Sequence, residues 1–404
     1  RKVRLPAEFV RRKSEAQSAG YHAWTKAREA NEYPAFAPHL KKLVDLAKEE
    51  AGYLGVEPAD AYDYWIDRFD PGMCQRIIDP LFEELKRELP GLVDEVMKTV
   101  PQADTAIFRN FPVDGQELFL REVIERIGFD FNRGRIDRSI HPFCSGSGSD
   151  IRMTTRFDVD NPLDSLTSAV HETGHALYEQ GLPEEHAGTA LGEAVGMAVH
   201  ESQSRIWENQ IARSRGFWEC FEPRYREIFP EQLAGVDSET FYAALNAVRR
   251  IPIRVDSDEV TYNQHIILRY ELEKRLFADT DAAVRNLPEI WREQAQLLLG
   301  LSPAHDAEGC LQDVHWSGGA FGYFPSYTLG NLLAAQLWES LQQALPDCEA
   351  QFARGEFSPV LTWLRENIHS HGRRWDTQEL ARKVTGSGLQ TAPLLRYLRG
   401  RYLG

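Results

Sequence analysis

Two histidines and a glutamate, in the order His171-Glu172-Thr173-Gly174-His175, are the residues of this chain whose types and spacing best suit catalysis. On a helix, residues four apart lie on one face, so His171 and His175 can offer imidazole nitrogens to one metal ion. Glu172 projects close to that face and can reach a water molecule held by the metal. This H-E-x-x-H arrangement is typical of zinc peptidases, in which the glutamate is the general base and not a ligand.

A site of this kind needs a third protein ligand and one open position. The predicted helix 189–213 supplies four candidates, Glu193, His200, Glu201 and Glu208. We expect Glu201 to be the ligand, because it lies mid-helix among apolar residues, where a carboxylate is costly unless it is paired or coordinated. An H-E-x-x-H motif followed by a glutamate on the next helix is the layout of the glutamate zincins. The alternative is that these histidines form a polar patch inside a helical protein.

A second stretch suited to chemistry runs from residue 309 to residue 330. It combines one histidine, two tyrosines, a tryptophan and several glycines. Because glycines allow close backbone approach, such a loop can place His315 and a tyrosine hydroxyl where an oxyanion develops. Packing of the aromatic rings in the core is the alternative interpretation.

The elements that position these residues are predicted to be mostly helices. Helix 162–181 carries the H-E-x-x-H motif, with Asp164 or Ser165 as its N-cap and Gly181-Leu182-Pro183 as its stop signal. Helices resume there and continue almost to the end of the chain. Upstream, amphipathic segments with apolar residues at three- and four-residue spacing are predicted as scaffold helices: 36–53, 59–69, 76–99 and 115–129.

Between residues 132 and 160 the apolar period changes from that of a helix to that of a strand. Segments 133–140 and 151–157 alternate like short strands, and a flexible run at 145–150 lies between them. We expect a small sheet that forms a wall of the substrate cleft, with an edge to which an extended peptide can add as a further strand. A structural hairpin with a mobile tip is the alternative.

Composition and charge exclude several classes of function. The chain has 61 acidic and 46 basic side chains, a net charge of −15, which argues against nucleic acid or an anionic membrane as the main partner. It lacks a run of about eighteen apolar residues, so we expect no membrane span. Five cysteines without CxxC spacing indicate a reducing compartment, and we expect a cytoplasmic location. Without a convincing linker or repeat, residues 1–404 are predicted to be one catalytic domain.

The chain resembles the carboxypeptidase Taq family of metallocarboxypeptidases over nearly its whole length. At one position, Ser257, the chain departs slightly from the family pattern, which usually has alanine there. Six separated signatures match in order: His141-Pro142-Phe143, Asp150-x-Arg152-x-Thr154, His171-Glu172-x-x-His175, His200-Glu201-Ser202-Gln203, Ile253-Arg254-x-x-Ser257-Asp258 and Gly309-x-x-Gln312-Asp313-x-His315-Trp316.

The resemblance implies a mainly α fold, that of a helical zincin of the neurolysin and angiotensin-converting-enzyme type, with a deep groove and a small β-sheet near the active site. It also implies removal of C-terminal residues from peptides with broad specificity. One divalent metal per chain, zinc or alternatively cobalt, and a homodimer are expected for the same reason. Family members extend further at the N-terminus, so we expect that segment to be absent from this chain.

The resemblance also assigns catalytic roles. His171, His175 and Glu201 would hold the metal, and Glu172 would take the proton of the attacking water and deliver it to the leaving amine. Groups on the loop would stabilise the tetrahedral intermediate. These are His315 and Tyr327, with Tyr323 as the competing choice.

Exopeptidase action further needs a cation for the substrate's terminal carboxylate, and bidentate pairing suits arginine. Arg254 is the first candidate and Arg152 the second, while His141 and Phe143 would close the primed end of the groove. Two other functions remain open. One is an oligoendopeptidase of the same fold without a carboxylate clamp. The other is a peptide-binding protein with a vestigial site, against which the retained Glu172 argues.

Overall fold

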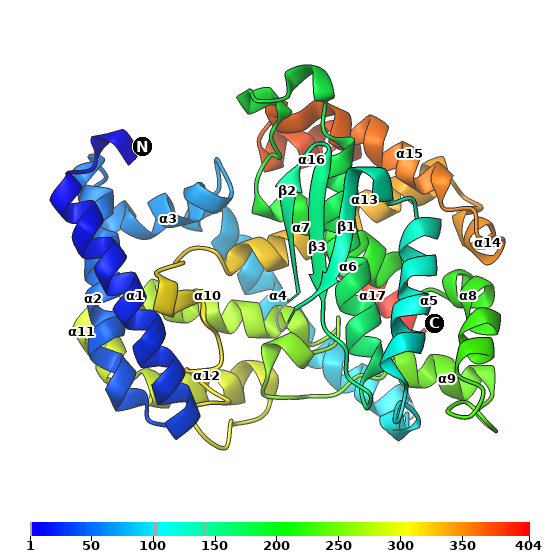
Figure 1. The fold of residues 1–404 in the computed structure, drawn as a ribbon. Coiled ribbons are helices and arrows are strands. Elements are labelled where there is room, and N and C mark those ends of the chain that lie inside the picture. Colours follow the sequence, from blue (N-terminus) through cyan, green and yellow to red (C-terminus); the bar gives the residue numbers. More distant parts are fainter. Residues whose placement is uncertain (1, 101–102, 140–141) are drawn as a thin grey trace. The chain divides into compact units, whose positions relative to one another are not determined.

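The protein is represented by a computed structural model that describes residues 2–100, 103–139 and 142–404. The described part is mainly helical with one small sheet, as predicted (Figure 1). The chain divides into two compact units: unit 1 comprises Arg1–Lys98 and Val248–Thr328, and unit 2 comprises Thr99–Ala247 and Leu329–Gly404. That residues 1–404 act as one catalytic domain stays a prediction. Among the described helices, none is long and apolar enough to cross a membrane.

Unit 1 is built around a helix that is buried on nearly every side. This helix is α10 (Tyr262–Ala278), and it packs against α12, α11, α3 and α2. Its buried set includes Arg269 and Glu273, which are both 0% exposed, so their charges must be satisfied inside the protein. The other helices of unit 1 are α1 (Ala7–Ala30), α2 (Tyr33–Tyr53), α3 (Ala61–Phe69), α4 (Gln75–Thr99), α11 (Thr280–Arg285) and α12 (Leu287–Leu299).

Unit 2 contains the sheet, whose strand order is β1-β3-β2. The strands are β1 (Gly134–Arg138), β2 (Phe143–Ser147) and β3 (Asp150–Thr155); β1 is parallel to β3 and β2 is antiparallel to it. Strands β2 and β3 pack on the metal-motif helix α6 (Pro162–Gly181). Both predicted strands are present, as β1 and β3. The prediction of a flexible run at 145–150 was wrong in part, because residues 145–147 pair with β3 within the separate edge strand β2.

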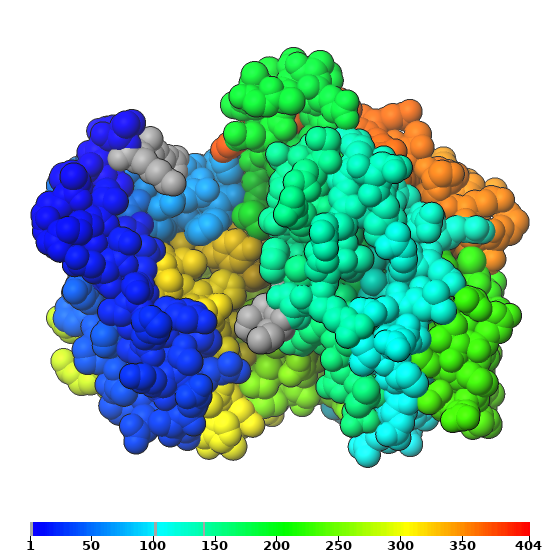
Figure 2. All heavy atoms as spheres, viewed as in Figure 1, coloured from blue at the N-terminus to red at the C-terminus, as the bar shows by residue number. Residues whose placement is uncertain are grey.

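The edge strand β2 is largely open to solvent, while β3 supplies the buried side of the sheet. Ile151 and Met153 of β3 are 0% exposed, whereas four of the five residues of β2 are exposed. In Figure 2 the teal segment that carries the strands lies at the surface of unit 2. The remaining helices of unit 2 are α5 (Val113–Arg126), α7 (Met197–Arg205), α8 (Arg215–Ile228), α9 (Ser238–Leu245), α14 (Cys348–Ala353), α15 (Ser358–Asn367), α16 (Thr377–Thr385) and α17 (Ala392–Tyr402); α13 (Pro325–Ala344) begins in unit 1 and continues into unit 2.

Helix α6 has its predicted bounds, but its N-cap differs from the prediction. The helix begins at Pro162, and the side chain of Asn161 at the N-cap position makes no capping hydrogen bond. Proline suits this first position because it has no N–H to satisfy and its φ already fits a helix. The predicted caps serve elsewhere: Asp164 accepts a hydrogen bond from Arg156 Nε at 2.6 Å, and Ser165 Oγ donates to the Pro162 carbonyl at 2.7 Å.

The predicted helix 189–213 is shorter and less regular than expected. Ala190–Gly192 is a 3₁₀ turn, the helix proper starts at Met197, and α7 passes into a π-helical turn at Ile206–Ile211. The extended backbone of Gly196 separates the 3₁₀ turn from the helix. The extra residue in a π turn rotates the side chains that follow, and such turns are frequent at functional sites.

Candidate active site

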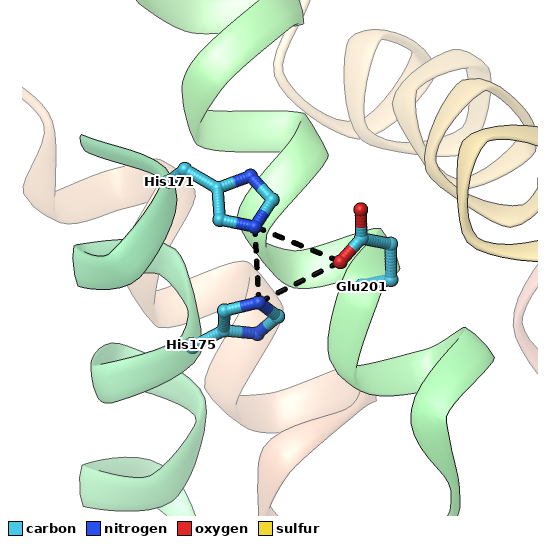
Figure 3. Close-up of side chains that lie close together, drawn as sticks. All are labelled: His171, His175 and Glu201. Carbon is cyan, nitrogen blue, oxygen red and sulfur yellow. Dashed lines mark hydrogen bonds and ion pairs between the residues drawn. The ribbon is translucent and has the colours of Figure 1, made fainter. Parts of the chain in front are cut away.

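Three side chains from α6 and α7 converge on one point in unit 2, as Figure 3 shows. His171 Nε2 and His175 Nε2 lie 3.2 Å apart, and Glu201 Oε2 lies 3.7 Å and 3.6 Å from them. Ligands about 2.0–2.1 Å from a tetrahedral ion stand roughly 3.4 Å apart, so these separations fit one metal ion. Two imidazoles and one carboxylate are also a donor set found at catalytic zinc sites.

Close packing of α6 on α7 brings Glu201 to the two histidines. A Cβ atom added at Gly174 would lie 2.5 Å from the Ser204 Cα atom and 2.7 Å from the Gln203 carbonyl oxygen. Only glycine therefore allows the two helix backbones to approach this closely. The glycine inside the H-E-x-x-H motif thus has a structural task of its own, which is to let the third candidate ligand reach the first two.

Further polar side chains contact the candidate ligands on the side away from their common point. Glu208, in the π turn, accepts a hydrogen bond from His171 Nδ1 at 2.8 Å, which leaves Nε2 to face the other ligands. Arg205 donates to Glu201 Oε1 at 2.7 Å and to Glu208 Oε2 at 3.1 Å. His200 Nδ1 lies 2.6 Å from His175 Nδ1. Such outer contacts fix the orientation of metal-binding side chains.

The alternative third ligands from the sequence therefore have other positions. Glu208 and His200 contact the two histidines on the side away from the common point, whereas Glu193 is an exposed residue paired with Arg373 at 3.2 Å. Arg205, which the sequence analysis missed, holds Glu201. It could have been found, because Arg205 follows Glu201 by four residues and such pairs contact each other on a helix.

Glu172 lies beside the candidate ligands and is 8% exposed. Burial raises the pKa of its carboxyl group to about 7; the neighbouring His171 lowers it and Glu201 raises it. A cation at the common point would favour the ionised form and oppose this shift. Glu172 is thus a buried carboxyl group next to the candidate ligands, and its burial raises its pKa toward neutrality.

In unit 1, Arg254 is held by hydrogen bonds on two sides of its guanidinium. Its Nε donates to Asp313 Oδ1 at 2.9 Å, and its Nη1 donates to Tyr262 Oη at 3.0 Å. Asp313 also accepts from Arg269 Nε at 2.7 Å, so one carboxylate faces two guanidinium groups. Burial opposes the ionised form of Asp313, but the two arginines outweigh it and lower its pKa far below the usual range. The cluster therefore keeps a net positive charge.

His315 and Tyr327, also in unit 1, contact each other. His315 Nε2 lies 3.3 Å from Tyr327 Oη, and the Tyr323 ring packs on both the His315 ring and the Tyr327 ring at centroid distances of 5.5 Å and 5.2 Å. Burial, together with Arg254 and Arg269, lowers the pKa of His315 to about 4 although Asp313 acts in the opposite direction. The imidazole is therefore neutral near pH 7.

The remaining candidate residues lie around the sheet of unit 2. Arg152 on β3 is exposed, and its Nε and Nη2 atoms donate to the two oxygens of Asp150 at 3.0 Å and 2.9 Å. Phe143 on β2 is 47% exposed. His141 lies outside the described residues.

Comparison with known proteins confirms the family resemblance. The family model of the carboxypeptidase Taq (M32) metallopeptidases matches residues 1–402. Thermostable carboxypeptidase 1 of Thermus thermophilus is 44% identical over 409 residues, which cover 99% of this chain and 79% of that protein. The crystal structure of an M32 carboxypeptidase from Deinococcus radiodurans R1 matches with a TM-score of 0.94 at 45% identity and covers 99% of this chain and 80% of that one. The chain therefore belongs to the carboxypeptidase Taq (M32) family and is a metallocarboxypeptidase.

Proposed function

We propose that this enzyme removes C-terminal residues from peptides with broad specificity, and that His171, His175 and Glu201 hold one zinc ion. The observation that carries the proposal is the near-equal separation of the three ligand atoms, 3.2 to 3.7 Å, with Glu172 beside them. When bound, such an ion lowers the pKa of water toward neutrality and polarises a carbonyl group. Cobalt is the alternative metal, and metal analysis of the purified protein distinguishes the two.

Glu172 acts as the general base in this proposal. Its carboxylate takes a proton from the attacking water and returns that proton to the leaving amine. Its place on α6, between two candidate ligands and nearly out of solvent, supports the role. Such a position shields the proton from bulk water before it reaches the leaving amine.

Arg254 binds the terminal carboxylate of the substrate. Two features support this choice over Arg152: Arg254 is fixed by Asp313 and Tyr262, and it belongs to a cluster with excess positive charge. A guanidinium fixed in advance loses less entropy when it pairs with a carboxylate. Arg152 is exposed and already paired with Asp150, so it is the weaker candidate.

His315 and Tyr327 stabilise the oxyanion of the tetrahedral intermediate. A neutral imidazole and a phenol are both hydrogen-bond donors, and the depressed pKa of His315 keeps it neutral at the working pH. Tyr323 is the competing donor. Phe143 closes the primed end of the substrate site; the same role for His141 rests on the family resemblance alone, since His141 lies outside the described residues. The family resemblance further leads us to propose a homodimer, testable by sedimentation, and a cytoplasmic location, testable by cell fractionation.

One experiment tests the exopeptidase assignment directly. A single peptide is prepared as the free acid and as the C-terminal amide, and both are followed by mass spectrometry over time. We expect stepwise loss of residues from the C-terminus of the free acid and very slow attack on the amide. Equal rates for the two forms, or internal fragments as first products, would instead identify an oligoendopeptidase.

A further inference from the structure

Glu273 of α10 is a fully buried carboxylate to which the proposed chemistry assigns no task. Its Oε1 accepts a hydrogen bond from Trp316 Nε1 at 2.7 Å. Its Oε2 accepts two, from Tyr62 Oη at 2.8 Å and from the Gly322 backbone N–H at 2.9 Å. One side chain thus receives donors from helix α3 and from two separate points of a single loop.

The two loop donors mark the ends of the segment 316–322. Trp316 directly follows His315, and Gly322 directly precedes Tyr323. Glu273 therefore joins the two ends of the segment that separates the histidine from the tyrosines. His315 lies directly before this segment and Tyr327 lies after it. The distance of 3.3 Å between His315 Nε2 and Tyr327 Oη therefore depends on how the segment is held.

The backbone at Gly322 shows that the loop is pressed tightly onto α3. Its φ is +76°, and an added Cβ would lie 2.5 Å from the Trp65 carbonyl carbon, so glycine is required on both counts. Tyr62, the third donor to Glu273, lies on the same helix α3. The carboxylate consequently sits where α10, α3 and the loop meet, and all these contacts lie within unit 1.

Stability alone does not favour an acid at this position. Burial raises the pKa of Glu273 to about 7, although the hydrogen bonds from Trp316, Tyr62 and Gly322 each lower it. Placing this group in the core is therefore costly. What a carboxylate offers, and an apolar or amide side chain does not, is acceptor capacity at both oxygens for three donors at once.

We propose that Glu273 is a positioning residue for catalysis: by fixing both ends of the segment 316–322, it sets the geometry of the His315–Tyr327 pair. This inference rests on the oxyanion role proposed above for that pair. Glutamine has one acceptor oxygen and one NH₂ group. In either orientation its NH₂ faces a donor, the Trp316 indole or the pair of donors from Tyr62 and Gly322. At least one end of the segment is then released.

The test compares Glu273→Gln with the matched control Glu271→Gln in the metal-loaded enzyme. Glu271 lies on the same helix, but its partner is Lys86, outside the loop. We expect Glu273→Gln to lower kcat by about 10- to 100-fold with little change in KM, since a small misplacement of a catalytic group has effects of this order. The control should keep the kcat of the wild type. Hydrogen exchange at the Trp316 indole N–H or at the Gly322 amide N–H, followed by NMR, should accelerate in Glu273→Gln and at neither site in the control.

A double-mutant cycle separates positioning from a general structural effect. In a His315→Ala background, Glu273→Gln should cause a smaller further loss of kcat than in the wild type, because one of the two residues it acts through is gone. A lower unfolding midpoint with unchanged kcat would overturn the inference and make Glu273 purely structural. If Glu273→Gln does not fold, Trp316→Phe removes one donor and should show a smaller loss of the same kind.

The cycle also distinguishes this inference from the function on which it rests. If His315→Ala loses activity and Glu273→Gln does not, only the positioning role is wrong. If His315→Ala keeps the kcat of the wild type, the proposed oxyanion role of His315 is wrong, and the positioning role falls with it.

Discussion

The Nδ1 atoms of His175 and His200 lie 2.6 Å apart, and His200 Nε2 lies 2.9 Å from Glu179 Oε1. This chain of contacts fixes the tautomers of both rings. His175 can offer Nε2 to a metal only if its proton is on Nδ1, from which it donates to His200 Nδ1. His200 then carries its proton on Nε2 and donates it to Glu179. The candidate ligand is thus oriented by a second histidine and, through it, by a carboxylate.

His200→Ala should weaken metal binding without abolishing it. Loss of an outer hydrogen bond to a ligand typically lowers metal affinity about 10- to 100-fold. Competition with a chromophoric chelator measures this directly, independently of turnover. His22→Ala, which changes an exposed histidine of α1, is the control and should bind metal like the wild type. Equal affinity of all three proteins would show that His200 does not orient His175.

Glu172→Gln should separate metal binding from chemistry. The variant should retain about one metal ion per chain but lose roughly 10²–10⁴ in kcat, because the general base is gone. Glu201→Ala should lose the metal itself. Metal content by atomic emission, measured together with turnover, tests both statements. Near-normal turnover of metal-checked Glu172→Gln would exclude this residue as the base.

Arg254→Ala should lose about 2–4 kcal/mol in kcat/KM on free-acid peptides and change the amide rate little. Arg254→Lys should recover only part of the loss, since an ammonium group lacks the planar fork. The measurement is the ratio of kcat/KM for the free acid and the amide of one peptide.

Arg152→Ala provides the comparison for Arg254. It removes the second candidate from an exposed strand, so its cost in stability should be small, whereas Arg254→Ala leaves the buried Asp313 with Arg269 as its remaining arginine partner. Thermal unfolding therefore accompanies the kinetics. If Arg152→Ala selectively lowers kcat/KM on free acids and Arg254→Ala does not, Arg152 is the residue that binds the terminal carboxylate.

Tyr327→Phe should lower kcat by about 10²–10³ with little effect on KM, as expected for a donor that acts mainly in the transition state. Tyr323→Phe is the comparison, because it removes the hydroxyl of the competing donor, whose ring packs on that of Tyr327. Steady-state kinetics on both variants decides between them. The reverse result would assign the oxyanion contact to Tyr323.

Glu273 should make the folded state less stable as pH rises. Its pKa is about 7 in the folded protein against an ordinary 4.5, so between these values the unfolded chain binds fewer protons and the free energy of unfolding falls. The shift corresponds to about 3 kcal/mol, fully expressed above about pH 7. The free energy of unfolding of the wild type should fall by this amount relative to that of Glu273→Gln between about pH 4 and about pH 8, because glutamine does not titrate. A constant difference would show that the pKa is not raised.

Much of the site could be predicted from local spacing. The histidines four residues apart needed only a helix to face one point, and helix 162–181 was predicted within its observed bounds. The choice of Glu201 as candidate ligand followed from its expected burial, because an acid among apolar neighbours requires a partner. By contrast, the start of α7 and its π turn were not predicted, since apolar periodicity does not register a single inserted residue.

The sequence by itself determined the metal motif, the mainly helical architecture and, through six separated signatures, the family. The tertiary structure decided which of the four candidates on the second helix lies with His171 and His175, because that depends on the close approach of two helices at Gly174. It also decided that His200 and Glu208 lie behind the candidate ligands and that Glu273 joins the ends of a distant loop. Such contacts link residues far apart in the chain. Periodicity reports only which face of its own helix a residue occupies, and not what that face meets.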